Sequence, residues 1–421
     1  MTSSNGKSFY GWWVVVGGTL IYFSGCACSF YSFGVFLPVV CADTGMSITA
    51  FSVSLSLFSL SMGLAAPLAG MSIGRFGARK NIIAGNLASA LGLMALYFAS
   101  QAWHFYLLFG VVSGLGQGFG MFVATTTVAN NWFIRRRAMA VALVVTAGAI
   151  GGFAGPTMSA ALISGIGWRL AWVALGGIVL VLAVILGGVL VRNRPEDMGQ
   201  MPDGGAPAAQ EESGVSRQGR VHQTSVDWRT RDALRTPAFW MIVAVMVAHG
   251  FALNTMVAHQ VSYLGDVGIS AMMAATAMGV VPGASIAGRL GFGYLATRFE
   301  TRHLVALLLV GLVAAVVILM SFTSLAMIYI YAVLFGICYG AIIPALPNFL
   351  GAYFGRANYA QILGWVMPVT TIFGAVAPIM AGAIRDGTGS YMPAFAVVAA
   401  LAGVSVVLAF LARPPQPRSG E

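Results

Sequence analysis

The chain has 421 residues, of which 58% are hydrophobic and only 8% are charged. A soluble domain usually carries about a quarter charged residues, so the charged side chains of this chain are too few to cover a surface that faces water. The composition therefore excludes an ordinary soluble protein and predicts an all-α membrane protein. The net charge of +10 does not point to nucleic acid, because the cations lie in short connectors between apolar runs.

Twelve apolar runs are long enough to span a membrane, which takes about 20 mainly apolar residues. We expect the first six helices at 12–40, 49–73, 82–99, 105–130, 138–163 and 170–191. The last six are expected at 238–264, 271–296, 304–322, 325–352, 361–384 and 392–412. The first run is too long for the apolar part of a signal peptide and has no small-residue cleavage site, so we expect it to be the first membrane helix.

The polar stretch 193–236 is the long interruption between the two sets of six runs. It contains Pro, Gly, Gln, Ser and charges of both signs, which is typical of a linker. This division predicts an N-terminal six-helix bundle at 1–192, a cytoplasmic linker at 193–236 and a C-terminal six-helix bundle at 237–421. A short surface helix is expected around Asp227 to Arg235.

The positions of Lys and Arg predict the orientation in the membrane. If the N-terminus is cytoplasmic, 19 of the 22 cations lie in cytoplasmic segments, whereas the outer loops hold only Arg169 and Arg385, and Arg289 is in neither set. An odd number of helices would break this pattern. We therefore expect a multi-pass protein of the inner (cytoplasmic) membrane with both termini in the cytoplasm.

The two halves of the sequence repeat each other. Segment 70–80 follows the second run and segment 293–303 follows the eighth, and both carry Gly, Arg, Phe and Arg at the same spacing. A second repeat pairs Phe133-Ile-Arg with Phe354-Gly-Arg, at nearly the same separation in sequence. Two repeats at one separation indicate duplication. Duplicated helix bundles with a binding site at their interface are the pattern of secondary transporters.

Segment 70–80 resembles the Gly-x-x-x-Asp-Arg-x-Gly-x-Arg-Lys loop of the major facilitator superfamily, with Gly74 in place of the usual aspartate. The resemblance implies the major facilitator fold, with 12 transmembrane helices in two pseudo-symmetric six-helix bundles. The missing acid weakens the charge-relay role that this loop has in the family.

Within that superfamily the chain resembles the monocarboxylate transporters and the related oxalate/formate antiporters. The segments that carry this likeness are Tyr10-Gly-Trp-Trp, Ser32-Phe-Gly-Val-Phe, Trp132-Phe-Ile-Arg-Arg-Arg-Ala-Met-Ala and Arg192-Asn-Arg-Pro-Glu-Asp-Met-Gly. The resemblance implies that a substrate-binding arginine occupies the place of Arg289. The eleventh run lacks the lysine expected of an oxalate antiporter, which favours a monoanion over a dianion.

Arg289 also stands out without any resemblance. It lies inside the eighth run, roughly 12 Å from the cytoplasmic edge at 1.5 Å per residue. Arginine in a membrane helix is costly and usually faces a cavity or a partner. No Asp or Glu falls inside any expected run, so an anionic substrate is the natural counter-charge, since guanidinium binds carboxylate through two hydrogen bonds. The alternative is an arginine that reaches the membrane interface or binds backbone carbonyls.

Two histidines, His249 and His259, lie in the seventh run. With no acid inside the helices, histidine is the ordinary side chain left to carry a coupling proton. The alternatives are a histidine that is hydrogen-bonded for packing, or a proton that travels on the bound carboxylate.

The remaining candidates for substrate binding are polar side chains of the expected cavity, namely Tyr31, Tyr339, Ser285, Gln117 and Asn348. In related monocarboxylate carriers the place of Tyr31 resembles that of a functional lysine, and some carry an aspartate at the place of Ser285. A lysine-based proton step therefore cannot be transferred to this chain. For Gln117 and Asn348, structural hydrogen bonding is an equally good interpretation.

These observations predict secondary active symport of a small organic monocarboxylate and a proton by alternating access. Arg289 binds the carboxylate, and His249 or His259 handles the proton. The alternatives are an exporter of hydrophobic or aromatic compounds, a carboxylate exchanger, and a membrane sensor that signals through the linker. No nucleotide-binding loop and no catalytic or metal-binding constellation occurs, so we expect no enzyme activity and no cofactor. The expected partners are an organic anion, a proton and the lipid bilayer, without nucleic acid.

Overall fold

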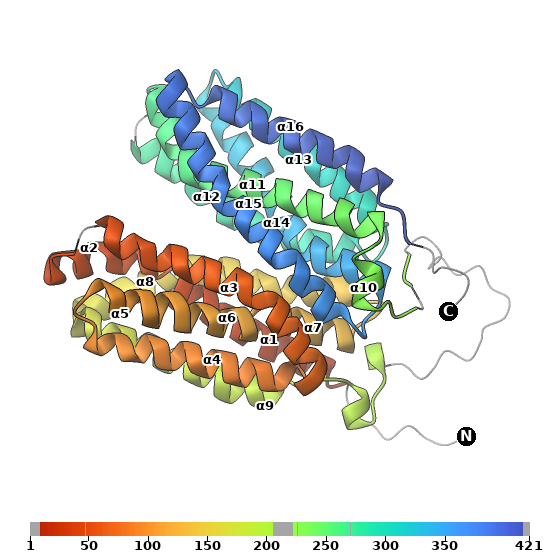
Figure 1. Cartoon of the computed structure of the whole chain (residues 1–421). Coiled ribbons are helices and arrows are strands. Elements are labelled where there is room, and N and C mark those ends of the chain that lie inside the picture. The colour runs from red at the N-terminus through yellow and green to blue at the C-terminus, as the bar shows by residue number, and fades with distance from the viewer. Residues whose placement is uncertain (1–8, 47, 205–221, 225, 270, 416–421) are drawn as a thin grey trace, which may run out of the picture.

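The computed structural model describes residues 9–46, 48–204, 222–224, 226–269 and 271–415, and within these ranges all regular structure is helical. The helices form two bundles that follow one another along the chain (Figure 1). This architecture confirms the all-helical expectation.

In the described part of the first bundle there are nine α-helices, some of which are pieces of one membrane span: α1 (Gly11–Gly25), α2 (Phe33–Thr44), α3 (Ile48–Phe76), α4 (Ala78–Ala95), α5 (Ala102–Phe105), α6 (Gly114–Gly120), α7 (Phe122–Trp132), α8 (Arg137–Val179) and α9 (Gly188–Leu190). Three π-helical segments join consecutive pieces: Cys26–Phe30, Tyr106–Ser113 and Leu180–Gly187. The second bundle consists of α11 (Pro237–Asp266), α12 (Ala271–Leu295), α13 (Thr301–Met320), α14 (Leu325–Phe354), α15 (Tyr359–Thr388) and α16 (Met392–Leu411).

Between the bundles, α10 (Thr230–Ala233) is a short helix inside the segment 227–235 where a surface helix is expected.

Among the described residues, ten helical stretches are long and apolar enough to cross a membrane. The stretch Arg137–Leu190 covers two expected spans. Gly167, with φ of 78°, interrupts the helix between these two spans. A residue with positive φ cannot continue a right-handed helix, which is why the chain turns at a glycine here. Helix α12, Ala271–Leu295, matches the expected span 271–296. The twelve expected spans therefore agree with the observed elements.

The first membrane span is less regular than the single run 12–40 suggests. Helix α1 passes into the π-helical segment Cys26–Phe30 and a turn before α2 begins. At this turn the Ser32 hydroxyl donates to the carbonyl of Ala27 and accepts a hydrogen bond from the Ser159 hydroxyl at 2.6 Å. These bonds satisfy polar groups that an interrupted helix exposes in a membrane interior. Hydrophobicity along the run carries no sign of this break.

The two bundles meet at the end of the molecule that carries both termini and lie apart at the opposite end (Figure 1). Helix α3 packs on α15 and helix α8 packs on α12 across this interface. Glycine allows the close approach of α3 and α15: a Cβ on Gly364 would lie 2.6 Å from the Ala66 carbonyl oxygen, and one on Gly70 would collide with the Ala360 carbonyl. Small residues at such crossings let helix backbones touch.

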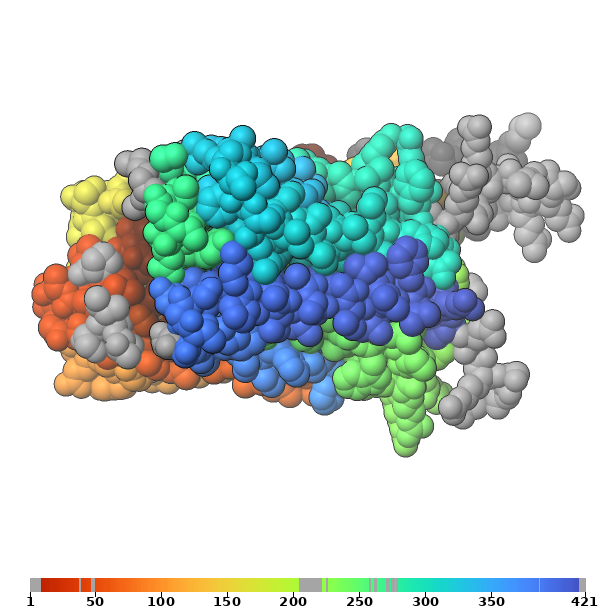
Figure 2. All heavy atoms as spheres, turned by 90° about the horizontal axis from the view of Figure 1, so that it is seen from above, coloured from red at the N-terminus to blue at the C-terminus, as the bar shows by residue number. Residues whose placement is uncertain are grey.

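The outer face of the second bundle is apolar. Figure 2 shows α16 lying beside other helices of this bundle along its length, and α13 packs directly on it. Leu307 of α13 is 67% exposed, and Val404 and Val407 of α16 are 59% and 57% exposed. Exposed apolar side chains in a continuous layer are stable in contact with lipid.

Candidate functional site

Arg289 lies on α12 at the interface between the two bundles and is only 3% exposed. Its Nη1 donates a hydrogen bond of 2.6 Å to the carbonyl oxygen of Val145 on α8, in the other bundle. Its Nε is buried and has no hydrogen-bond partner among the described residues. None of the ion pairs in the described part of the chain involves this guanidinium. The cation is therefore only partly satisfied, by one backbone carbonyl.

Side chains of the first membrane span lie in the same region as this guanidinium, in the opposite bundle. Tyr22, Cys26 and Tyr31 all lie within electrostatic range of Arg289. Tyr31 follows the π-helical segment and is 37% exposed, with its ring close to Gly152 on α8. The irregular part of the first span thus faces the buried cation, which agrees with the frequent occurrence of π-helical turns at functional sites.

His249 on α11 is the second buried polar group of this region, with 7% exposure. Its ring stacks on that of Tyr339 of α14, with centroids 5.8 Å apart and planes inclined by 15°. Its Nδ1 is buried and has no partner among the described residues, and the ring lies within electrostatic range of Arg289. Arg289, His249, Tyr339 and Tyr31 therefore lie in one region, although they belong to four different membrane spans.

A cavity of about 250 Å³ lies between the bundles, and His249 forms part of its wall. Most of its lining is apolar and both bundles contribute; the residues are Tyr22, Met62, Gly63, Ala66, Gln117, Gly118, Met121, Phe122, Val123, Met246, His249, Gly250, Ile343, Leu346, Met367, Thr370 and Thr371. Gln117 is part of this lining, and its Nε2 donates to the Ser89 hydroxyl at 2.9 Å. Arg289 itself is not part of the lining.

Six of the residues chosen from the sequence do not line this cavity, and three of them bond locally within the chain. The Ser285 hydroxyl donates to the carbonyl of Pro282 at 2.7 Å, a bond within its own helix. The Asn348 Nδ2 donates to the Thr301 hydroxyl at 2.6 Å and so joins α14 to α13 inside the second bundle. His259 is half-buried, and its Nε2 lies 3.0 Å from the carbonyl oxygen of Pro378. Each of the three thus has a local bonding partner that accounts for its position.

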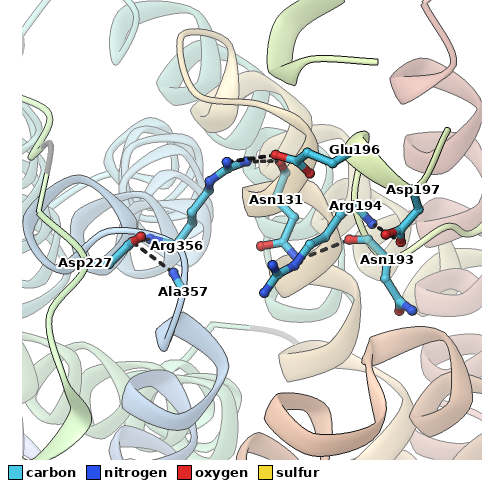
Figure 3. A network of polar contacts seen from close by, with 8 residues as sticks. All are labelled: Asn131, Asn193, Arg194, Glu196, Asp197, Asp227, Arg356 and Ala357. Atoms are coloured by element: carbon cyan, nitrogen blue, oxygen red, sulfur yellow. Dashed lines mark hydrogen bonds and ion pairs between the residues drawn. The ribbon is translucent and has the colours of Figure 1, made fainter. Parts of the chain in front are cut away.

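A second group of polar contacts holds the bundles together at the end that carries the termini. We call Asn131, Asn193, Glu196, Asp227 and Arg356 the terminal-side network (Figure 3). Arg356, which precedes α15, pairs with Glu196 at 2.8 Å and donates to the Asn131 carbonyl at 3.3 Å. Asn131 in turn donates from Nδ2 to the carbonyl of Asn193 at 3.1 Å. These bonds connect the second bundle to the first.

Two aspartates of the segment between the bundles accept backbone hydrogen bonds at equivalent places in the two halves. Asp203 accepts from the N–H groups of Ile134 and Arg135, just before α8, at 3.0 and 2.8 Å. Asp227 accepts from the N–H groups of Arg356 and Ala357, just before α15, at 2.8 and 3.0 Å. Carboxylates are stabilising at the beginnings of helices because free N–H groups and the helix dipole meet there.

Several of these features cannot be predicted from the sequence. Tyr22, Met62 and Met367 are ordinary apolar or aromatic residues of three different spans, and their common cavity arises only from packing. The pairing of Glu196 with Arg356 joins residues far apart in sequence. One local signal did exist, because Glu196 belongs to the segment 192–199 that carries part of the family resemblance.

The fold and the interfacial site define a class of protein. The family model of the Major Facilitator Superfamily matches residues 19–326 and 265–421, and the chain belongs to this superfamily of membrane transporters. It is therefore a multi-pass membrane transporter rather than an enzyme. Among solved structures, it is similar to the transporter FucP in the outward conformation, with a TM-score of 0.72 and 14% identity over 95% of this chain and 99% of that one.

Particular relatives are closer in sequence. The chain is 27% identical over 350 residues to monocarboxylate transporter 12 of Xenopus laevis, covering 81% of this chain and 75% of that protein. It is also 27% identical over 357 residues to monocarboxylate transporter 13 of Bos taurus, covering 83% and 78%. A third relative, MFS transporter asaE of Aspergillus flavus, is 25% identical over 361 residues, covering 83% and 74%. The expected resemblance to monocarboxylate transporters is confirmed.

Weakening the terminal-side network is expected to shift the balance between the two openings of the transporter. The side chains of Arg356 and Glu196 are 35% and 45% exposed, so their ion pair contributes only about 0.2–1 kcal/mol. Glu196→Gln is therefore expected to change the ratio of the two states by up to about fivefold, and Arg356→Gln by more, since it also loses the bond to the Asn131 carbonyl.

Spin labels on cysteines placed at Ser164 and Thr323 can measure this shift, because these positions are exposed and belong to different bundles. The inter-label distance is expected to shorten in both variants, and the charge exchange Glu196→Arg with Arg356→Glu is expected to restore it. Asp266→Asn, which breaks an ion pair within the second bundle, serves as the control. Unchanged distances in all network variants would show that these contacts do not hold the observed state.

Proposed function

We propose that this transporter moves a small organic monocarboxylate together with a proton across the cytoplasmic membrane by alternating access. The observation that carries the proposal is the buried Arg289 guanidinium, which has one carbonyl partner and an Nε without one. A buried cation that lacks an acid is costly, and a bound carboxylate would compensate it. The relatives named monocarboxylate transporters support this choice of substrate class.

The bond between Arg289 and the Val145 carbonyl suggests how binding is linked to movement. This bond joins α12 of one bundle to α8 of the other. A charge-assisted pair with carboxylate is roughly twice as strong as a bond to a neutral acceptor. In our proposal the substrate replaces the carbonyl, and the guanidinium then no longer ties the two bundles together. The loaded carrier is thereby freed to rock around the site.

We further propose that both termini and the linker 193–236 are cytoplasmic, between bundles at 1–192 and 237–421. The asymmetric distribution of Lys and Arg supports this orientation. It follows that the structure, whose bundles meet at the end with the termini, is closed toward the cytoplasm and open toward the outside.

His249 is our proposed proton carrier, since its Nδ1 has no partner and its ring lies near Arg289. In proteoliposomes, an inward-directed proton gradient is expected to drive accumulation of a labelled monocarboxylate. His249→Gln is expected to retain exchange of labelled for unlabelled substrate but to lose most of the gradient-driven accumulation. His259→Gln, whose parent ring binds a backbone carbonyl, is the matched control. Normal accumulation by both variants would mean that the proton travels on the substrate carboxylate.

A second candidate function is export of hydrophobic or aromatic compounds. It is favoured by the apolar lining of the central cavity and by the absence of Arg289 from that lining. The two functions differ in their dependence on charge. An exporter of this kind would carry uncharged aromatic molecules, and its activity would not change in Arg289 variants.

A further inference from the structure

We infer that the substrate is a monocarboxylate with a bulky apolar tail, such as a branched or aromatic acid, and that the tail occupies the central cavity beside His249. The inference rests on the proposed function and narrows it to a chemical class. It excludes as preferred substrates the short acids whose tail is one or two carbons.

The lining of the cavity is the first observation behind this assignment. Four methionines face it, Met62 and Met121 from the first bundle and Met246 and Met367 from the second. Methionine is flexible and polarisable, adapts to irregular apolar shapes and makes favourable contacts with aromatic rings. A site built to bind a short hydroxy acid would instead need several polar groups directed at its hydroxyl.

The volume is the second observation. The cavity measures about 250 Å³, close to the lower end of the range of about 300–1,000 Å³ for pockets that hold drug-sized ligands. A short carboxylic acid would leave much of this apolar space without contacts. A phenyl or branched alkyl group would fill it and remove its apolar surface from water.

The third observation connects the cavity to the cation. Tyr22 and His249 form part of the wall of the cavity, and both lie within electrostatic range of Arg289. Arg289 is not in the lining, and its Nη1 is held by the Val145 carbonyl. A ligand that pairs with the guanidinium and also contacts the methionines must therefore extend past these two aromatic side chains. Only an acid with an extended or bulky tail reaches both regions.

Binding measurements on the purified full-length chain test this assignment. Propionate, 3-methylbutanoate and 3-phenylpropanoate have similar acidity but tails of increasing size, and 3-phenylpropanamide is an uncharged control. Each additional buried methylene is expected to increase affinity roughly fourfold. We therefore expect 3-phenylpropanoate to bind at least about tenfold more tightly than propionate, and Arg289→Gln to abolish the binding of both acids.

Filling the cavity provides the second part of the test. Met367→Trp is expected to weaken binding of 3-phenylpropanoate at least about tenfold and to leave propionate almost unchanged. Met62→Trp, from the other bundle, is expected to do the same and replaces the first variant if that one does not fold. Met71→Trp is the matched control, since Met71 is 47% exposed and does not line the cavity.

The outcomes separate this inference from the function on which it rests. If propionate binds as tightly as 3-phenylpropanoate and both depend on Arg289, the apolar tail is refuted and the carboxylate transporter stands. Folded cavity-filled variants that bind 3-phenylpropanoate as tightly as the parent protein would likewise refute it. If no acid binds, or if the amide binds as well as the acid regardless of Arg289, the proposed function itself fails.

Discussion

Replacing Arg289 by glutamine is expected to lower the kcat/KM of carboxylate uptake at least about thirtyfold. Truncating one partner of a buried, hydrogen-bonded charge pair costs about 2–5 kcal/mol, and 2 kcal/mol corresponds to about thirtyfold. Arg289→Lys is expected to recover only part of the activity, because lysine keeps the charge but cannot form two parallel bonds to a carboxylate. Uptake of labelled acid into proteoliposomes measures both effects.

The control for this prediction is Arg298→Gln, a few residues beyond the end of the same helix. Arg298 is exposed, and its guanidinium stacks on the Tyr294 ring at 4.5 Å from the ring centroid. The substitution Arg298→Gln removes the same charge without touching the interface. Uptake by this variant is therefore expected to stay within twofold of the parent protein. The melting temperature of each variant shows whether it has folded. A folded Arg289→Gln protein with normal uptake would remove the proposed role of this residue.

Placing a valine at Gly70 is expected to arrest transport without unfolding the protein. Gly70 on α3 lies against the Ala360 carbonyl on α15, and there is no room for a side chain between the two bundles. Overpacking costs about 1–3 kcal/mol or more. The bundles can avoid this cost by separating at the end with the termini, which shifts the population toward the opposite opening by about tenfold or more. The spin labels at Ser164 and Thr323 are then expected to move closer together.

A comparison with two other glycines makes this prediction specific. Gly116 packs within the first bundle, where a Cβ would lie 2.5 Å from the Gly85 carbonyl oxygen, and its helices cannot separate without loss of the fold. Gly116→Val is therefore expected to lower the yield and melting temperature, unlike Gly70→Val. Gly403 on α16 has nothing near its Cβ position, so Gly403→Val is expected to transport normally. Normal exchange by Gly70→Val would show that this contact does not constrain the cycle.

The sequence was a good guide to the membrane helices. The expected run 304–322 compares with α13 at Thr301–Met320, and the run 325–352 compares with α14 at Leu325–Phe354. Agreement of this kind has a simple origin, because lipid imposes one length and one composition on every spanning helix. The first span is less regular than its hydrophobicity suggests, because the turn after the π-helical segment Cys26–Phe30 bonds through Ser32 to Ser159 of α8.

For the candidate site the result was mixed. Arg289 was identified from its isolation in an apolar run, and the structure adds its bond to Val145 and its unpaired Nε. His249 lies at the cavity, whereas Asn348 bonds to Thr301 inside one bundle. The sequence does not distinguish His249 from Asn348, since each is a polar residue in an apolar helix. Which way such a side chain points depends on the rotation of its helix about its own axis.

By itself, the sequence determined the class of protein, the number and approximate limits of its helices, the repetition of its two halves and the position of Arg289 inside an apolar run. These properties depend on composition and on local apolar runs, because the low polarity of the membrane favours apolar side chains at each position of a spanning helix. The tertiary structure alone decided which side chains meet: the Val145 carbonyl with Arg289, the methionines around one cavity, and Glu196 with Arg356. These contacts join residues of different helices, so they depend on how closely and at what angle the helices pack.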